Sequence, residues 1–167
     1  MEKLSVKAEV NSLSEVQSFV DRILEENGCQ MKAQMQIDIA VEELFVNIAH
    51  YAYPSGEGDA IIEVDTESVT DCVKITFEDG GVPYDPLKHE DPDVTLSAEE
   101  RQIGGLGIFM VKQSMDDISY EYAGNRNRLT IIKKIKKSKK NAKKTGSHCN
   151  KTVPKTLPIS NLVTVFL

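Results

Sequence analysis

The chain has 167 residues and a net charge of −6, a length and charge that suit one soluble domain with a modest hydrophobic core. Its three cysteines, Cys29, Cys72 and Cys149, are odd in number and far apart, which excludes a disulfide framework or a zinc knuckle and favours the reducing cytoplasm. The N-terminal residues lack a signal-peptide pattern and no apolar run approaches about 18 residues, so we expect neither export by that route nor a membrane segment.

The charge is divided unevenly along the chain. Residues 1–132 carry all 26 acidic side chains and 10 of the 20 basic ones, a net charge of −16. Residues 133–167 carry the other ten basic residues, all lysines, and no acidic residue. Because an acidic body repels phosphate backbones, we expect no direct binding of nucleic acid by the main part of the chain.

The hydrophobic periodicities predict eight helices and strands in the order β-α-α-β-β-α-β-β. The predicted elements are a strand at 3–10, a helix from a cap at Ser12 or Ser14 to Gly28, a helix from about Met31 to before Pro54, strands at 60–67 and 72–78, a helix after Gly107, and strands at 117–122 and 127–135 around a Gly124-Asn125 turn. This order favours an α/β two-layer sandwich in which three helices cover one face of a mixed, mostly antiparallel sheet.

The last part of the chain differs from the rest, so we divide the chain into a domain at 1–135 and a tail at 136–167. Residues 136–158 are rich in lysine and poor in apolar side chains, a composition that cannot bury enough surface to fold. Residues 159–167 are apolar and β-prone. The tail is therefore interpreted either as disordered or as a docking peptide.

The second helix carries two distinct faces. Its apolar stripe recurs at helical spacing and consists of Ile37, Val41, Leu44 and Ile48. At about 100° per residue, Glu43, Asn47 and His50 gather on another face, and Glu42 falls on the opposite flank, where it can be solvated. A carboxylate such as that of Glu43 can accept a proton, and the amide oxygen of Asn47 is a suitable Mg²⁺ ligand.

Two glycine-containing segments suggest contacts with a ligand. Asp79-x-Gly81-x-Pro83 follows a predicted strand: the carboxylate can accept a hydrogen bond from an exocyclic amine, the glycine lets the backbone approach a flat ring, and the proline stiffens the exit. The segment 104–107, GGLG, precedes a helix, whose first N–H groups and dipole favour anions such as phosphate. This segment is not a Walker A loop, because no GK[ST] follows it.

These pieces occur in a specific order: a helix with Glu-x₃-Asn, a strand with DxGxP, a segment without steady period, GGLG before a helix, and a strand with Thr130. The ordered set resembles the GHKL (Bergerat-type) ATP-binding superfamily and, more closely, the stand-alone bacterial anti-sigma-factor serine/threonine kinases. The resemblance covers roughly residues 4–135.

The resemblance implies a role for each matching residue. Glu43 matches the general base for a serine hydroxyl, and Asn47 matches the Mg²⁺ ligand of the ATP site. Asp79 matches the acid that reads adenine, and Gly81 and Pro83 belong to the same nucleotide-binding loop.

The remaining matches concern the phosphate end of the nucleotide and the lid. Gly105, Leu106 and Gly107 match the loop under the phosphates, and Thr130 matches the strand threonine near the base. Residues 84–103 match the lid, in which Arg101 is either the cation nearest the γ-phosphate or a solvated arginine.

One position departs from the family pattern. The family commonly has a histidine just before Ala-Tyr, whereas this chain has Tyr51 at that place and His50 one residue earlier. His50 therefore inherits no role from the resemblance, and we expect a neutral histidine on the exposed face of the helix.

The resemblance implies an ATP- and Mg²⁺-dependent serine/threonine kinase that acts as an anti-sigma factor in the cytoplasm. Its implied partners are a sigma factor and a small antagonist protein that it phosphorylates, and it is expected to be a homodimer. Two alternatives are an ATP-binding module that regulates partners without phosphoryl transfer and a structural domain without ligand. A histidine-kinase fragment is disfavoured, because no helix with a phosphoacceptor histidine is expected before residue 1.

Overall fold

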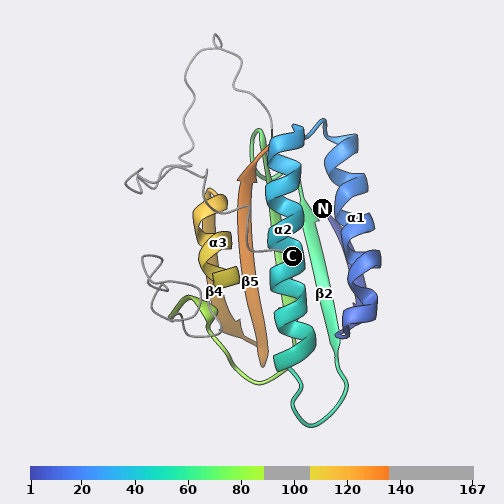
Figure 1. Cartoon of the computed structure of the whole chain (residues 1–167), viewed down its shortest axis with the longest axis vertical. Helices are drawn as coiled ribbons and strands as arrows, with labels where there is room; N and C mark the ends of the chain where they lie inside the picture. The colour runs from blue at the N-terminus through green and yellow to red at the C-terminus, as the bar shows by residue number, and fades with distance from the viewer. Residues whose placement is uncertain (89–105, 136–167) are drawn as a thin grey trace, which may run out of the picture.

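The computed structural model describes residues 1–88 and 106–135 of the chain. Within these ranges three α-helices lie on one face of a five-stranded sheet, which confirms the predicted two-layer sandwich (Figure 1). The predicted order of helices and strands is also confirmed. The elements are β1 Glu2–Lys7, α1 Leu13–Glu26, α2 Met31–Tyr51, β2 Asp59–Asp65, β3 Cys72–Asp79, α3 Leu106–Ser114, β4 Asp117–Ala123 and β5 Arg126–Lys134, with short 3₁₀ turns at Val10–Ser12 and Pro86–Lys88.

The strands are arranged in the order β1-β2-β3-β5-β4, and every neighbouring pair among them is antiparallel. The described part of the sheet is therefore antiparallel throughout, and the expectation of a mixed sheet was wrong. The reason lies in the connection between β1 and β2. Two helices, α1 and α2, separate these strands and pack as a helical hairpin, so the chain has reversed its direction when β2 begins (Figure 1).

Two local signals in the sequence correspond to features of the backbone. Gly124 and Asn125 have φ angles of 61° each, as a two-residue type I′ hairpin turn requires, and they connect β4 to β5. Gly28 has a φ of +67° just beyond the end of α1, as predicted for a glycine that ends a helix. Ser12 precedes α1 but makes no capping hydrogen bond through its side chain, so it marks the start of the helix without capping it.

The hydrophobic core lies between the helices and the sheet. The predicted stripe of α2 faces this core: Ile37, Val41 and Leu44 are buried, and Ile48 packs at its edge. Phe45 is buried beside them, and Phe77 from β3 is among the largest fully buried side chains. At about 1.5–3 kcal/mol for each fully buried large apolar side chain, this contact between layers fixes the position of α2 on the sheet. Among the described residues, no helix combines the length and the apolar character that crossing a membrane requires.

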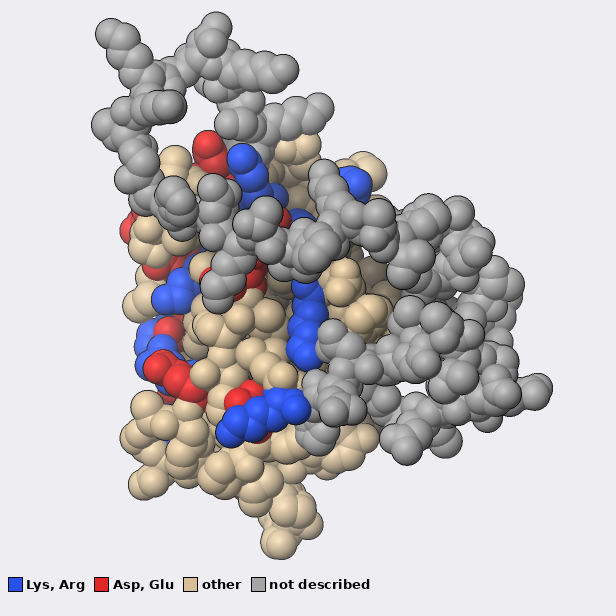
Figure 2. All heavy atoms as spheres, turned by 90° about the vertical axis from the view of Figure 1, so that its left-hand side faces the viewer, with Lys and Arg blue, Asp and Glu red and all other residues tan. Residues whose placement is uncertain are grey.

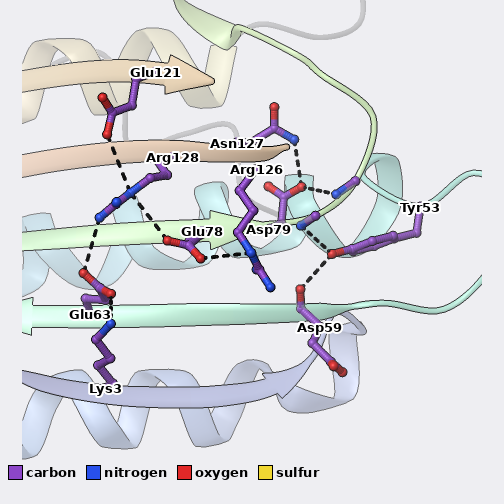
Figure 3. Close-up of polar contacts among 12 residues, drawn as sticks. Lys3, Tyr53, Asp59, Glu63, Glu78, Asp79, Glu121, Arg126, Asn127 and Arg128 are labelled. Atoms are coloured by element: carbon purple, nitrogen blue, oxygen red, sulfur yellow. Dashed lines mark hydrogen bonds and ion pairs between the residues drawn. The ribbon is translucent and has the colours of Figure 1, made fainter. Parts of the chain in front are cut away.

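The face of the sheet opposite the helices carries a network of ion pairs. Glu63 pairs with Lys3, and Arg128 lies 3.6 Å from Glu63 and 3.5 Å from Glu78 (Figure 3). Arg126 Nε lies 3.2 Å from Glu78 Oε1. Basic and acidic side chains are also interspersed on the neighbouring side of the molecule (Figure 2). The side chains of Glu63 and Glu78 are only 12% and 14% exposed, whereas their basic partners are 36–54% exposed, so these pairs are partly buried. The arginines and the lysine thus compensate two carboxylates that the sheet partly removes from water.

Two carboxylates lie close together where α1 packs against α2. Asp21 of α1 accepts a hydrogen bond from Gln34 Nε2 at 3.0 Å. Burial, then the charge of Asp21 and a hydrogen bond with it, raise the pKa of Asp38 to about 7. The two acids therefore carry fewer than two negative charges near neutral pH.

We predict that Asp38→Asn removes a pH dependence of folding stability. The pKa of Asp38 is raised to about 7 in the folded state, so its contribution is complete below the unfolded pKa of about 4 and is lost as the pH rises through 7. Because the side chain is only half-buried, we expect the variant to be more stable than the parent above pH 7 by about 1 kcal/mol. Urea unfolding on both sides of neutrality measures this, with the exposed Glu42→Gln as control. An equal effect of Asp38→Asn at acidic and alkaline pH would contradict the prediction.

Candidate functional site

Asp79 occupies the end of β3 and is held in one orientation. It is 5% exposed, and its Oδ1 accepts hydrogen bonds from Gly81 N at 2.9 Å and from Asn127 Nδ2 at 2.8 Å (Figure 3). The structure thus brings together Asp79 and Gly81, the first two residues of the predicted DxGxP motif. A buried carboxylate with two fixed donors is a preorganised acceptor rather than a mobile surface charge.

Asn127 is the residue that organises this end of the sheet, and sequence reasoning missed it. It is 6% exposed and lies directly opposite Asp79 in the β3–β5 register. Besides Asp79, its Nδ2 donates to Val82 O at 3.0 Å, and its Oδ1 accepts from Tyr84 N at 3.1 Å. One amide therefore holds the backbone on both sides of the exposed Pro83. An asparagine inside a predicted strand was the available signal, because this residue is depleted in strands.

A tyrosine of β4 completes the environment of Asn127. Tyr120 donates its hydroxyl hydrogen to Asn127 Oδ1 at 2.7 Å. The amide oxygen therefore accepts two hydrogen bonds and the amide nitrogen donates two, which satisfies the buried side chain.

The loop after β3 also packs against the end of α2. Val82 N donates to Ala52 O at 2.9 Å. A Cβ added to Gly81 would lie 2.6 Å from the carbonyl carbon of Ala52, closer than real Cβ atoms approach a neighbour. The described structure thus accounts for this glycine by its contact with the backbone after α2. The expected approach of Gly81 to a flat ring stays a prediction.

Tyr53 links the same loop to the start of β2. Its hydroxyl donates to Asp59 O at 2.8 Å and accepts from Gly80 N at 2.8 Å (Figure 3). Burial is the main cause that raises the pKa of Tyr53, so the hydroxyl stays protonated and able to donate. The DGGVP loop is therefore fixed from three sides, by α2, by β5 and by this tyrosine.

Glu43 of α2 lies against the first turn of α3. A Cβ added to Gly107 would overlap with the Glu43 carboxylate oxygen Oε2, so the carboxylate sits directly over this glycine. Burial, and then the charge of Glu42, raise the pKa of Glu43. Glu42 itself is exposed, as the sequence predicted. The structure thus brings the predicted base into contact with the segment that was predicted to bind phosphates.

Asn47 is half-buried on α2, one turn after Glu43. Among the described residues, no group of three or more His, Cys, Asp or Glu side chains could hold a metal ion by itself. The amide oxygen of Asn47 is a donor that suits Mg²⁺, because this ion keeps several waters and commonly binds through one or two protein oxygens together with substrate phosphates. His50 and Tyr51 are both exposed, with their rings edge to face at 5.8 Å.

Thr130 does not lie with the other predicted site residues. It pairs with Thr76 in the sheet, and the two hydroxyl oxygens are 2.9 Å apart. Because side chains alternate along a strand, Thr76 and Thr130 point to the face opposite that of Asp79 and Asn127. The structure thus separates Thr130 from Asp79, and the expected role of Thr130 near the base stays a prediction. Asn127 is the residue of β5 that faces Asp79.

A model of the histidine kinase-like ATPase domain family matches residues 6–133. The chain belongs to this family. Among curated proteins, it is 31% identical over 99 residues to the serine-protein kinase RsbW of Listeria monocytogenes, an alignment that covers 57% of this chain and 62% of that protein. It is 25% identical over 100 residues to the serine/threonine-protein kinase BtrW of Bordetella bronchiseptica, covering 60% and 70% respectively. The chain thus spans less than two thirds of the length of the first of these relatives.

A solved structure supports the fold. The crystal structure of the RsbU and RsbW domains of Rv1364c from Mycobacterium tuberculosis matches with a TM-score of 0.52 and 13% identity, covering 81% of this chain and 33% of that one. At this identity the match supports the fold alone and does not extend to the chemistry of the site.

Part of the site expected for a histidine kinase-like ATPase lies outside the described residues. This applies to Gly105, to Arg101 and to residues 89–103 of the predicted lid, as well as to the tail at 136–167. Leu106 and Gly107 are described and form the start of α3. The roles of all these residues stay predictions.

We predict that Gly81→Ala destabilises this ATPase domain by about 1–3 kcal/mol, the usual cost of overpacking a site whose neighbour cannot move away. The added Cβ would meet the backbone of Ala52, whereas Gly56→Ala has open space within 4 Å and serves as the matched control. Urea unfolding of both variants measures the difference. If the two variants are equally stable, the contact between the loop and α2 does not constrain the glycine.

Proposed function

We propose that this chain binds ATP with Mg²⁺ and transfers the γ-phosphate to a serine or threonine of a small protein partner. The observation that carries the proposal is the contact between Glu43 and Gly107, which joins a partly desolvated carboxylate to the first turn of a helix. Phosphoryl transfer depends mainly on positioning and on neutralising charge, and these groups are held by packed helices rather than by free loops.

Asp79 is assigned to the adenine. Within the described residues, its two hydrogen bonds with Gly81 and Asn127 both use Oδ1, so we assign Oδ2 to the exocyclic amine of the base. The network around Asn127 keeps this carboxylate from rotating. A fixed acceptor of this kind distinguishes a base with an amino group from a base with a carbonyl group at the same place. A carbonyl oxygen would face Asp79 Oδ2 with no hydrogen atom between the two acceptors.

Glu43 is assigned as the general base. Its raised pKa makes the carboxylate a stronger base, which favours acceptance of a proton from a hydroxyl group. Gly107 lies in the first turn of α3, where backbone N–H groups and the helix dipole favour phosphate oxygens. A side chain at position 107 would displace the Glu43 carboxylate.

Asn47 is assigned to Mg²⁺, through its amide oxygen. When bound, the ion neutralises part of the charge on the phosphates. The main body of the chain is acidic, so we expect the affinity for ATP to depend strongly on Mg²⁺.

The partners we propose come from the resemblance and from the names of the relatives. We propose a cytoplasmic anti-sigma regulator that forms a homodimer, binds a sigma factor and phosphorylates an antagonist protein. The second candidate is an ATP-binding module that changes partners without transferring phosphate. The exposed Tyr51 favours keeping this candidate, because it stands where the family commonly has a histidine.

We predict that Glu43→Ala retains ATP binding and reduces phosphoryl transfer by about 10²–10⁴-fold, the usual contribution of a general base. Glu15→Ala is the control, since Glu15 is an exposed glutamate on α1 and does not contribute to the raised pKa of Glu43. Calorimetry measures binding, and transfer of label from γ-labelled ATP to a candidate antagonist measures the reaction. Undiminished transfer by Glu43→Ala would remove the assigned base. Tight binding without transfer or phosphate release in the unsubstituted chain would favour the regulatory module.

We predict that Asn127→Ala weakens ATP binding by about tenfold, because Asp79 and the loop around Pro83 lose a shared hydrogen-bond partner. Thr130→Val should leave the affinity unchanged, since Thr130 faces the other side of the sheet. Titration calorimetry with ATP and Mg²⁺ compares the two variants. The reverse order of effects would place the base on the opposite face, and the absence of both heat and thermal stabilisation in the unsubstituted chain would indicate a structural domain without ligand.

A further inference from the structure

The N-terminal half of α2 exposes an apolar stripe, defined as Met31, Met35 and Ile39. Their exposed fractions are 79%, 61% and 45%. They recur at a spacing of four residues, so they lie along one side of the helix, while Ile37 and Val41 on its other side are buried in the core. Single exposed apolar side chains are ordinary, whereas three on successive turns form a continuous apolar surface and make it a candidate docking site.

The C-terminal segment leaves the domain at the beginning of this stripe. Gln30, which precedes α2, donates its backbone N–H to Ile135 O at 3.2 Å. Ile135 is buried and is the last residue that the structure describes. The end of β5 thus lies beside the start of α2 (Figure 1). The described part of the chain therefore ends beside the N-terminal end of the helix that carries the apolar stripe.

The sequence of this segment is complementary to the surface it leaves. Residues 159–167, ISNLVTVFL, contain six apolar side chains in nine positions, and residues 136–158 contain eight lysines and no acidic residue. The nearby end of α1 exposes Glu25 and Glu26. The connecting 23 residues can reach about 75 Å when extended, whereas the apolar stripe is only about 12 Å long, so length does not limit the contact.

We propose that residues 159–167 bind to the apolar stripe of the same molecule. Three side chains on one helix are too small a surface for a stable dimer, which buries about 800 Å² of each partner, but they match a short apolar peptide. Attachment through a 23-residue connection that begins beside the stripe keeps the segment at a high effective concentration. The series of four-residue steps continues from Ile39 to Glu43, so the apolar stripe itself ends one turn before the proposed catalytic residue. This inference does not depend on the proposed kinase activity.

A single tryptophan tests the proposal in the full chain, which has none of its own. Phe166→Trp places the reporter in the segment, and its emission and its quenching by acrylamide are measured with and without Met35→Glu. Val10→Glu is the matched control, because Val10 is an apolar side chain of 46% exposure that lies outside the apolar stripe. Met31→Glu provides a second variant of the stripe, and circular dichroism verifies that each variant is folded.

We expect emission shifted to the blue and severalfold weaker quenching in the Phe166→Trp protein, independent of protein concentration. Met35→Glu and Met31→Glu should each move the emission to that of a solvated tryptophan, whereas Val10→Glu should not. Solvated emission before any stripe substitution would overturn the proposal, and so would a blue shift that the stripe variants do not change. A blue shift that disappears on dilution would assign the apolar stripe to a second copy of the chain instead.

Discussion

The hydrogen bond between Asn127 and Asp79 is the interaction on which the candidate site depends. It joins the ends of two central strands whose residues are 48 positions apart in the sequence. The same amide holds the backbone at Val82 and Tyr84, so the carboxylate and the loop beside it are fixed together. Because this group is buried, the loss of one partner leaves others unsatisfied, and the network behaves as a unit.

Helix α2 connects this network to the rest of the molecule. Its apolar side is packed into the core, its C-terminal end supports the DGGVP loop through Ala52, and Glu43 in its middle contacts Gly107 of α3. The adenine end and the phosphate end of the proposed site are thus positioned by one rigid element. The N-terminal half of the same helix carries the apolar stripe. The apolar stripe and the site residue Glu43 therefore share one helix as their support.

The features that the sequence predicted well depend on local chemistry. Alternation and helical spacing identified the strands and helices, and the Gly124-Asn125 pair identified a hairpin turn, because such patterns act over a few residues. The order of the motifs was sufficient to indicate the family, which the match over residues 6–133 confirmed. Glu43 and Glu42 could be assigned to different faces from helical geometry alone.

The sequence by itself determined the two-layer architecture, the family and the identity of the acidic and amide groups on α2. Only the tertiary structure decided which residue of β5 faces Asp79. That choice depends on the register between β3 and β5, and a shift of a single residue moves every side chain to the other face of the sheet. For this reason Thr130, which motif order favoured, lies on the outer face, and Asn127, which is unusual within a strand but matched no motif, lies beside the carboxylate.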